Sequence, residues 1–312
     1  MSEFHHISVL LQECLDGLDI KPDGIYVDGT LGGAGHSSQI AKRLTTGRLI
    51  GIDRDPVALA AAGERLKPYS DRVTLVHSNF CEISKVLDDL DIEAVDGILL
   101  DLGVSSPQLD DSSRGFSYMA DAPLDMRMNN EDPVTAADIV NTWSYEELRR
   151  ILFDYGEERY APQIAANICR RRETAPIKTT LELVDVIRSA MPAQALREKQ
   201  HPAKRSFQAI RIAVNDELGA VRKVMDAAIP RLKTGGRLAI ITFHSLEDRI
   251  VKNGMADAAK GCTCPPSFPV CVCGKKPQVK LVNRKPIVAT EEELEVNPRS
   301  RSAKLRVCEK MG

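Results

Sequence analysis

Residues 25–36, IYVDGTLGGAGH, decide the fold. A β-rich run ends at Asp28, a glycine-rich loop follows, and helical periodicity begins at Ser37. Glycines let the backbone approach a ligand closely, and the helix that follows offers free N–H groups at its N-terminus. Because open α/β sheets bind ligands at the carboxyl ends of their strands, we expect a ligand site in this loop.

Short β-rich runs alternate with helical runs after this loop. The expected strands are 25–28, 48–53, 73–76 and 95–100, and the expected helices are 37–44, 56–66 and 81–90. Strand followed by helix, repeated, indicates a parallel sheet with helices on both faces. The predicted fold class is therefore α/β, with a Rossmann-like sheet.

The alternation stops after Leu100 and resumes near residue 206. Residues 110–205 have helical periodicity and no convincing strand, whereas 206–232 predict one long helix. Further strands are expected over 237–243 and near 279–282 and 304–307. We therefore predict one α/β domain, residues 1–109 and 206–312, split by a helical insertion, residues 110–205.

The composition is typical of a soluble globular protein. The 312 residues are 43% hydrophobic, and 42 Lys+Arg against 44 Asp+Glu give a net charge of −2. A polyanion would have to bind to a local basic surface. The sequence shows neither an apolar run long enough to span a membrane nor a signal peptide, so we expect a cytoplasmic protein with no membrane partner.

Further polar side chains stand where neighbouring strands are expected to end. Asp53 lies 18 residues after Gly35, where a carboxylate can accept hydrogen bonds from ribose hydroxyls. The loop lacks a clean G-x-G-x-x-G, which a dinucleotide pyrophosphate requires. S-adenosylmethionine has no pyrophosphate and fits better, with Phe80 over the adenine and Asp101 near the sulfonium or amino group. For Phe80 alone, a core aromatic is the simpler interpretation.

The segment after the fourth expected strand, DLGVSSPQLD, is the candidate for the chemical step. An exocyclic base amine is a poor nucleophile because its lone pair is delocalised into the ring, so an enzyme must accept its N–H hydrogens. Asp101, Ser105, Ser106 and carbonyls held by the Pro107 turn are candidates for that role. The alternative is a strand-ending turn, which Ser-Pro favours anyway.

His244 closes the strand expected over 237–243, beside the same edge of the sheet. Methyl transfer needs no strong general base, so its candidate catalytic role is substrate positioning. Ser245 with Asp248 is expected to cap the helix that follows.

Several blocks, in order along nearly the whole chain, resemble one known family. The most specific are DLGVSSPQLDD, APLDMRM and FHSLEDRIVK. The sequence is similar to the bacterial small-subunit (16S) ribosomal RNA cytosine-N4 methyltransferases. All the matching blocks are 6–11, 26–36, 51–56, 96–110, 114–117, 123–128, 155–159, 201–203, 207–212, 243–252 and 297–305.

The resemblance implies a class I S-adenosylmethionine-dependent methyltransferase sheet, split by the helical insertion. It implies methylation of the N4 amine of a cytosine in the decoding centre of 16S ribosomal RNA. The expected cofactor-binding residues are the loop residue Gly33 and, by the resemblance, Ala34, Gly35, His36, Asp53, Phe80, Asp101 and Gln108. Family members usually have Gly where this chain has Ala34, which narrows the loop without abolishing binding.

The resemblance also implies that the insertion recognises RNA. Its candidate phosphate contacts are Arg170, Arg171, Arg172, Lys199, Lys204, Arg205 and Arg211, unless these only solvate helices. Residues 275–312 hold ten Lys/Arg against five Glu, which suits phosphate contacts or balances acidic patches elsewhere. The implied partner is 16S ribosomal RNA, within the small ribosomal subunit. No DNA is expected, and the oligomeric state stays open, a homodimer included.

Four cysteines cluster in one short segment. Cys262, Cys264, Cys271 and Cys273 are enough in number for tetrahedral zinc, but C-x-C is not the usual C-x₂-C spacing. The resemblance brings no metal, so reduced thiols in a proline-rich hairpin are favoured and no metal is assigned.

Three other functions share parts of this pattern. A non-catalytic ribosome-assembly factor would keep the fold and bind RNA, and an NAD-dependent oxidoreductase would share the sheet and the loop. A methyltransferase that acts on a protein or a small molecule would share the cofactor site.

Overall fold

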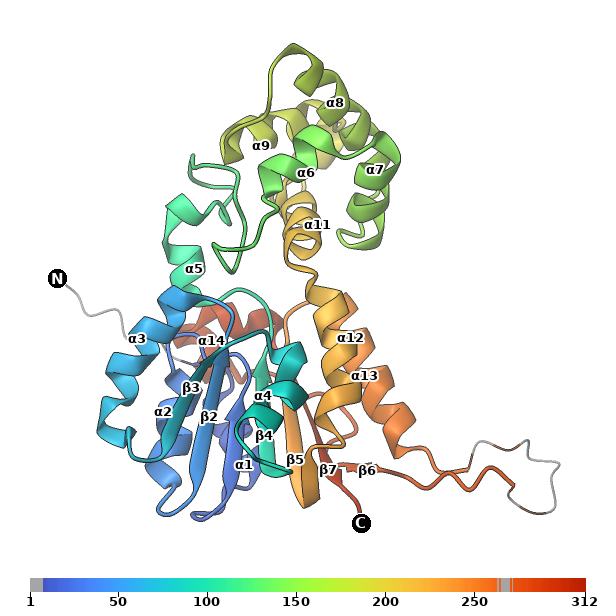
Figure 1. Cartoon of the computed structure of the whole chain (residues 1–312). Helices are drawn as coiled ribbons and strands as arrows, with labels where there is room; N and C mark the ends of the chain where they lie inside the picture. Colours follow the sequence, from blue (N-terminus) through green and yellow to red (C-terminus); the bar gives the residue numbers. More distant parts are fainter. Residues whose placement is uncertain (1–7, 263, 265–269, 271) are drawn as a thin grey trace. The chain divides into compact units, whose positions relative to one another are not determined.

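The computed structural model describes residues 8–262, 264, 270 and 272–312, and the chain divides into two compact units (Figure 1). Unit 1 combines Met1–Gly103 with Leu218–Gly312, and unit 2 is Val104–Glu217. The predicted insertion, 110–205, lies inside unit 2, which begins six residues earlier and ends 12 residues later.

A seven-stranded sheet forms the centre of unit 1. Its order is β3-β2-β1-β4-β5-β7-β6. β1 to β5 are parallel to one another, and β7 is antiparallel to β5 and β6. The strands are β1 (Ile25–Asp28), β2 (Arg48–Asp53), β3 (Val73–His77), β4 (Val95–Asp101), β5 (Leu232–Thr242), β6 (Val279–Leu281) and β7 (Lys304–Lys310). The predicted Rossmann-like sheet is confirmed.

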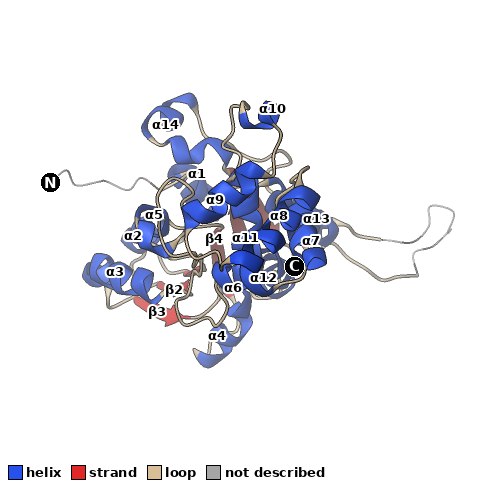
Figure 2. Cartoon of the chain, turned by 90° about the horizontal axis from the view of Figure 1, so that it is seen from above, coloured by secondary structure: helices blue, strands red, loops and turns tan. Residues whose placement is uncertain are grey.

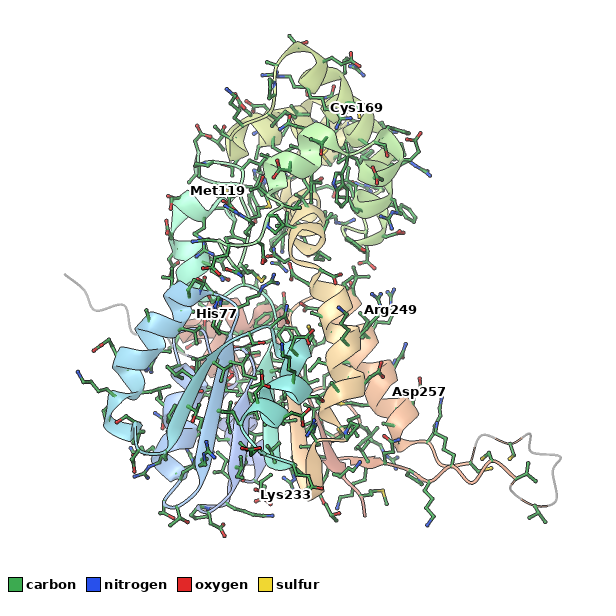
Figure 3. All side chains as sticks on the ribbon, in the orientation of Figure 1. His77, Met119, Cys169, Lys233, Arg249 and Asp257 are labelled. Carbon is green, nitrogen blue, oxygen red and sulfur yellow. The ribbon has the colours of Figure 1, made fainter. Side chains whose placement is uncertain are left out.

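The strand register brings the carboxyl ends of β1 to β5 to one edge of the sheet. Asp28 is level with Leu99 of β4, Asp53 with His77, and Asp101 with Ile241. Figure 3 labels His77 at this edge and Lys233 near the opposite edge. The chain changes direction between β1 and β4, and the crevice outside such a switch point is where ligands of open α/β sheets bind.

Side chains alternate between the two faces of the sheet, and each face has its own core. Ile98 and Leu100 of β4 pack into one core, whereas Leu99 packs into the other. α1 (Leu11–Leu18), α2 (Gly35–Arg43) and α3 (Pro56–Leu66) supply residues to the Leu99 core. α4 (Ile83–Asp89), α12 (Glu217–Ala228) and α13 (Ser245–Ala259) supply the other. Figure 2 shows α1 and α2 on one side of the strands and α4 on the other.

The predicted single helix over 206–232 is wrong. The structure has α11 (Lys204–Asn215) in unit 2, then Asp216 in the left-handed region with φ 47°, then α12. The buried Asn215 side chain donates to Met126 O and accepts from Met128 N, both at 2.8 Å. These bonds fix the end of α11 against its own unit. The helical turn therefore stops at Asp216, and β5 begins earlier than expected, at Leu232.

Unit 2 is a helical bundle around its own core. Its helices are α5 (Ser106–Asp110), α6 (Ala136–Thr142), α7 (Tyr145–Asp154), α8 (Ala161–Thr174), α9 (Thr180–Ser189), α10 (Ala193–Leu196) and α11. Capping boxes begin α6, α7 and α9, where a Ser or Thr side chain and an acidic side chain three residues later satisfy the first N–H groups. Core residues include Ile151, Ile164, Leu183 and Phe207.

The remaining elements are short. They are α14 (Glu291–Val296) and the 3₁₀ turns Lys67–Tyr69, Phe80–Glu82, Ser112–Arg114 and Pro298–Ser302. Among the described residues, no helix has the length and apolar character needed to cross a bilayer.

Candidate active site

The glycine-rich loop lies over the carboxyl ends of β1, β2 and β4. Gly29 N donates to Leu99 O at 2.9 Å, and Leu31 N donates to Ile52 O at 3.0 Å. A side chain at Gly35, the first residue of α2, would place its Cβ 1.9 Å from Ser8 Oγ. The loop is therefore held on both neighbouring strands, and a side chain at Gly35 would require the Ser8 hydroxyl to turn away.

Ala34 occupies the left-handed region, with φ 56°, and is fully buried. An L-residue costs roughly 1–2 kcal/mol there, whereas glycine does not. This conformation gives a physical reason for the glycine that the resemblance implies at this position. The methyl group packs in the core of unit 1, so the expected narrowing of the loop toward a ligand stays a prediction.

Asp28 supports the loop from below. Its carboxylate accepts from Ser37 Oγ at 2.7 Å and from Thr30 N at 3.1 Å, and it is almost fully buried. Burial raises its pKa to about 6, against the lowering effect of these hydrogen bonds. Asp28 thus ties the loop to α2.

Asp53 ends β2 and also holds the loop. Its Oδ2 accepts from Gly32 N at 2.7 Å, and its Oδ1 accepts from Asp55 N at 2.9 Å. Burial raises its pKa to about 6, and the carboxylates of Asp55 and Asp28 add to that rise. Each carboxylate oxygen has a second lone pair, so the side chain can still accept from a ligand hydroxyl.

Asp101 ends β4 and has a carboxylate oxygen that lacks a partner. Its Oδ1 is buried and accepts no hydrogen bond within the described chain, while its Oδ2 lies 3.8 Å from His36 Nδ1. Burial, with the nearby Asp28 and Glu247 carboxylates, raises its pKa to about 8. A buried oxygen without a donor is costly, so Asp101 is suited to a cationic or donating group of a ligand.

His36 and Phe80 line the same edge. His36 is buried, and its Nε2 is 3.0 Å from Val9 O, which fixes the ring against Asp101. Phe80 begins a 3₁₀ turn after β3 and is partly buried against the core. Its Cβ lies close enough to the loop to be 3.1 Å from a Cβ built at Gly29. Phe80 therefore packs against the core and also lies next to the glycine-rich loop.

His244 follows β5 and serves as the N-cap of α13. Its Nδ1 accepts from Glu247 N at 3.4 Å, and its Nε2 lies 3.1 Å from Glu247 Oε1. The Glu247 carboxylate also accepts from Phe243 N at 2.9 Å. The expected cap by Ser245 with Asp248 is wrong, because His244 and Glu247 form the capping box. This geometry favours a positioning role, and a catalytic role for His244 stays a prediction.

Unit 2, not unit 1, contains the segment with Ser105, Ser106, Pro107 and Gln108. Ser105 is the N-cap of α5, and its side chain accepts from Gln108 N at 3.4 Å. The Gln108 side chain is buried and accepts from Ser105 N at 3.0 Å. Locally, the segment is therefore the capped start of a short helix, with Pro107 in its first turn. The roles expected for these residues stay predictions.

Two residues with clear parts in the site were missed from the sequence. Thr30 Oγ1 accepts from Asp101 N at 2.5 Å and so joins the loop to β4. Glu247 fixes the ring of His244 and helps to raise the pKa of Asp101. A Glu three residues after an N-cap is a known signal, but histidine is not a usual N-cap residue.

Some of the candidate phosphate contacts in unit 2 already form hydrogen bonds or ion pairs within the protein, and others do not. Arg211 forms a two-point ion pair with Glu217, with both N–O distances 2.8 Å. The guanidinium groups of Arg171, Arg172 and Arg205 donate to the backbone carbonyls of Ala175, Val140 and Glu157, respectively. Arg170, Lys199 and Lys204 are exposed. Arg205 is exposed too, so what distinguishes Arg170, Lys199 and Lys204 is that they make no such bond among the described residues. These three are thus the best placed to meet phosphate.

Some cations of the basic C-terminal segment form ion pairs within unit 1. Arg306 Nε and Lys304 Nζ pair with Asp248 at 2.7 and 3.3 Å, and Lys280 pairs with Glu309 at 2.8 Å. Arg306 is buried. Asp248 therefore offsets the charge of Arg306, whereas the side chains of Lys304 and Lys280 stay 41% and 60% exposed.

The residues at the sheet edge fit S-adenosylmethionine. Asp28, Asp53 and Asp101 form a carboxylate group in which each pKa is raised, so the edge favours a cation. The donor carries a sulfonium, an ammonium and two ribose hydroxyls, and the unpartnered Oδ1 of Asp101 matches a cationic or donating group.

Comparison with known proteins gives the same assignment. The chain matches the model of the MraW methylase family over residues 3–311. It is 58% identical over 311 residues to the ribosomal RNA small subunit methyltransferase H of Heliobacterium mobile, covering 99% of this chain and 100% of the relative. The proteins of the same name from Brevibacillus brevis and Clostridium botulinum strain Kyoto are each 59% identical, covering 99% of this chain and 98% and 100% of the relatives.

These matches span both units and confirm the resemblance stated from the sequence. They exclude the oxidoreductase alternative and identify the sheet as that of a class I S-adenosylmethionine-dependent methyltransferase. The chain belongs to the MraW methylase family.

Proposed function

We propose that this chain methylates the N4 amine of a cytosine in the decoding centre of 16S ribosomal RNA, in the cytoplasm and within the small ribosomal subunit. The observation that carries the proposal is the identity of 58–59% to proteins named ribosomal RNA small subunit methyltransferase H, over 99% of this chain. A match of this extent includes unit 2 as well as the cofactor sheet. It therefore favours a shared substrate over a methylase that acts on a protein or a small molecule.

The sheet edge would hold the methyl donor. Bound S-adenosylmethionine supplies an electrophilic methyl group on a sulfonium. We assign the ribose hydroxyls to Asp53, whose two oxygens keep lone pairs, and the adenine to Phe80. Asp101 would face the ammonium or the sulfonium with its unpartnered oxygen, and Gly33 to His36 would present the backbone of the loop.

The acceptor amine has to be turned toward the methyl group. We assign this task to the hydroxyls of Ser105 and Ser106, the backbone carbonyls of the segment up to Pro107 and, in unit 1, the carboxylate of Asp101. The amine nitrogen forms a bond to the methyl carbon as the methyl–sulfur bond breaks, which leaves a neutral thioether and an N-methylated cation. That cation loses one proton to solvent, because it is strongly acidic. The target base must be flipped out or already unstacked, because its amine is otherwise engaged in pairing.

Unit 2 would bind the RNA through its exposed cations, Arg170, Lys199 and Lys204. Phosphate contacts of this kind position a substrate and carry no sequence information by themselves.

The test is transfer of labelled methyl from S-adenosylmethionine to small ribosomal subunits that lack the modification, with naked RNA in parallel. The nucleoside is identified by mass spectrometry. Label in N4-methylcytidine is the expected result, with more transfer to subunits than to naked RNA. Protein that binds the donor and labels neither substrate would reject the RNA assignment and favour a non-catalytic assembly factor.

A further inference from the structure

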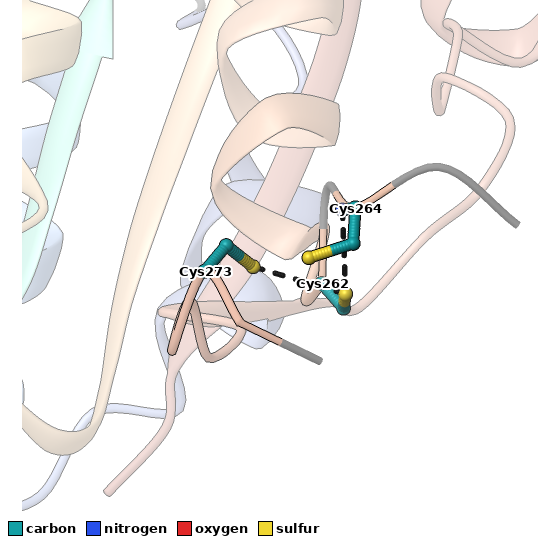
Figure 4. Close-up of side chains that lie close together, drawn as sticks. All are labelled: Cys262, Cys264 and Cys273. Carbon is teal, nitrogen blue, oxygen red and sulfur yellow. Dashed lines mark hydrogen bonds between the residues drawn. The ribbon is translucent and has the colours of Figure 1, made fainter. Parts of the chain in front are cut away.

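Three cysteine thiols gather in the segment between α13 and β6. The Sγ atoms of Cys262, Cys264 and Cys273 all lie within 4.8 Å of one another (Figure 4). Cys271, the fourth cysteine of the sequence pattern, lies outside the described residues. We propose that unit 1 binds a structural Zn²⁺ ion through the thiolates of Cys262, Cys264 and Cys273.

The sulfur spacing suits a tetrahedral ion. Zinc–sulfur bonds of about 2.3 Å at tetrahedral angles place neighbouring sulfurs roughly 3.8 Å apart. The Sγ atoms of Cys262 and Cys273 are 3.7 Å apart. A disulfide would require about 2.05 Å. The pair thus already has the edge length of a zinc tetrahedron, and every other pair has to close by only about 1 Å to reach it.

The backbone already supports a thiolate at this place. Cys264 N donates to Cys262 Sγ at 3.4 Å, the outer hydrogen bond that stabilises a metal-bound sulfur. Lys260 and Lys275 lie on either side of the cluster in the sequence, and both contact Asp257 at the end of α13. Three thiolates on Zn²⁺ leave one net negative charge. Lys275 can balance it, because its ammonium donates to a backbone carbonyl, whereas Lys260 is paired with the Asp257 carboxylate.

The described residues of this segment have little apolar packing. Val270 and Val272 are 71% and 74% exposed, and Cys262 and Cys273 are exposed as well. At the base, Gln278 N donates to Ala258 O at 2.8 Å. A stretch without a hydrophobic core gains stability from a cross-link, and a metal ion is a common one. The ion would therefore fix the fold of this segment.

The donor set narrows the choice of metal. Thiolates select zinc, copper(I) or iron–sulfur clusters over magnesium, calcium and manganese. Methyl transfer moves no electrons through the protein, so a redox-active centre has no task here. Zn²⁺, which has no redox chemistry and favours tetrahedral sulfur sites, fits this cluster.

The first experiment measures metal by mass spectrometry in the full-length, untagged chain, purified with reductant and without chelator or added metal. We expect about one zinc per chain. The double variant Cys262→Ala/Cys273→Ala should lose it. Cys169→Ala, which removes a thiol from α8 of unit 2, should keep it.

A second readout avoids variants that fail to fold. Wild-type chain stripped with chelator is titrated with Co²⁺, and the visible bands of tetrahedral cobalt–thiolate are recorded, then displaced by Zn²⁺. The proposal is overturned by wild-type protein that retains less than about a tenth of a zinc per chain and gives no such bands. Equal zinc in the double variant and the Cys169 control would also overturn it, as would iron with inorganic sulfide.

Discussion

Replacing Asp101 by Asn should make the donor-free protein more stable, increasingly so as the pH rises. The folded pKa of Asp101 is about 8, against 3.8 for the unperturbed group. Between these values the folded state keeps a proton that the unfolded chain has lost. Its stabilising effect is full below pH 4 and is lost as the pH rises toward 8. Asn is neutral at every pH, so the variant does not lose this stability as the pH rises.

The magnitude follows from the two pKa values. Between pH 6.5 and 7.5, the stability of the wild type should fall relative to Asp101→Asn by about 1 kcal/mol. Asp28 and Asp53, with pKa values of about 6, titrate mostly below this window. Because both proteins share all other groups, the difference between them isolates Asp101.

The assay is urea unfolding of both proteins at the two pH values. The single tryptophan, Trp143, lies in unit 2, so its fluorescence follows that unit while circular dichroism follows both. The added stability of Asp101→Asn should appear in the dichroism transition of unit 1. A difference between the two proteins that does not change with pH would refute the reasoning.

The same substitution should weaken donor binding. At pH 7 wild-type Asp101 is about nine-tenths protonated without ligand, so binding of a cation should release up to about 0.9 proton from it. Calorimetry in two buffers of different ionisation enthalpy measures that release. In Asp101→Asn this proton should be missing and the affinity lower by tenfold or more, roughly 1.4 kcal/mol. Equal proton release in both proteins would assign the cation to another group.

Three further outcomes are expected. Gly35→Ala should lower unit 1 stability by about 1 kcal/mol in urea unfolding, because Ser8 Oγ, 1.9 Å from the added Cβ, would have to turn away, and Ser8→Gly should recover part of the loss. No recovery would place the clash elsewhere. Asp248→Ala should cost about 3 kcal/mol in the same assay, because it leaves the buried Arg306 cation without its carboxylate. Equal stability would mean that Arg306 finds another partner. Arg170→Ala should weaken RNA binding and reduce the salt slope by about one, measured by filter binding at several salt concentrations. An unchanged slope would remove Arg170 from the interface.

The sequence predicted the parallel sheet well because each strand is short, β-rich and bounded by turn residues. β2 was placed at 48–53, where the structure has it. The helix at 206–232 was wrong for a physical reason: helical periodicity continues on both sides of Asp216, and no Gly or Pro marks the break. What ends α11 is the Asn215 bond to Met126, 89 residues away in the chain.

The site was predicted as a set of positions, and its energetics came only from the structure. Strand ends placed Asp53 and Asp101 at one edge, because parallel strands share a direction. Burial leaves Asp101 Oδ1 without a hydrogen-bond donor, and burial and Glu247 raise the pKa of Asp101. Sequence spacing reports neither effect. Likewise, counting charges after residue 275 could not reveal that Arg306 is paired with Asp248.

Charge separates the two tasks that the proposed reaction sets. A cationic donor requires carboxylates, yet carboxylates repel the phosphates of an RNA substrate. The carboxylates of Asp28, Asp53 and Asp101 lie at one sheet edge, and burial raises the pKa of each. The raised pKa keeps Asp101 mostly neutral until a cation binds. The exposed cations Arg170 and Lys204 belong to unit 2. A net charge of only −2 is therefore compatible with RNA binding, because phosphate contacts depend on local exposed cations.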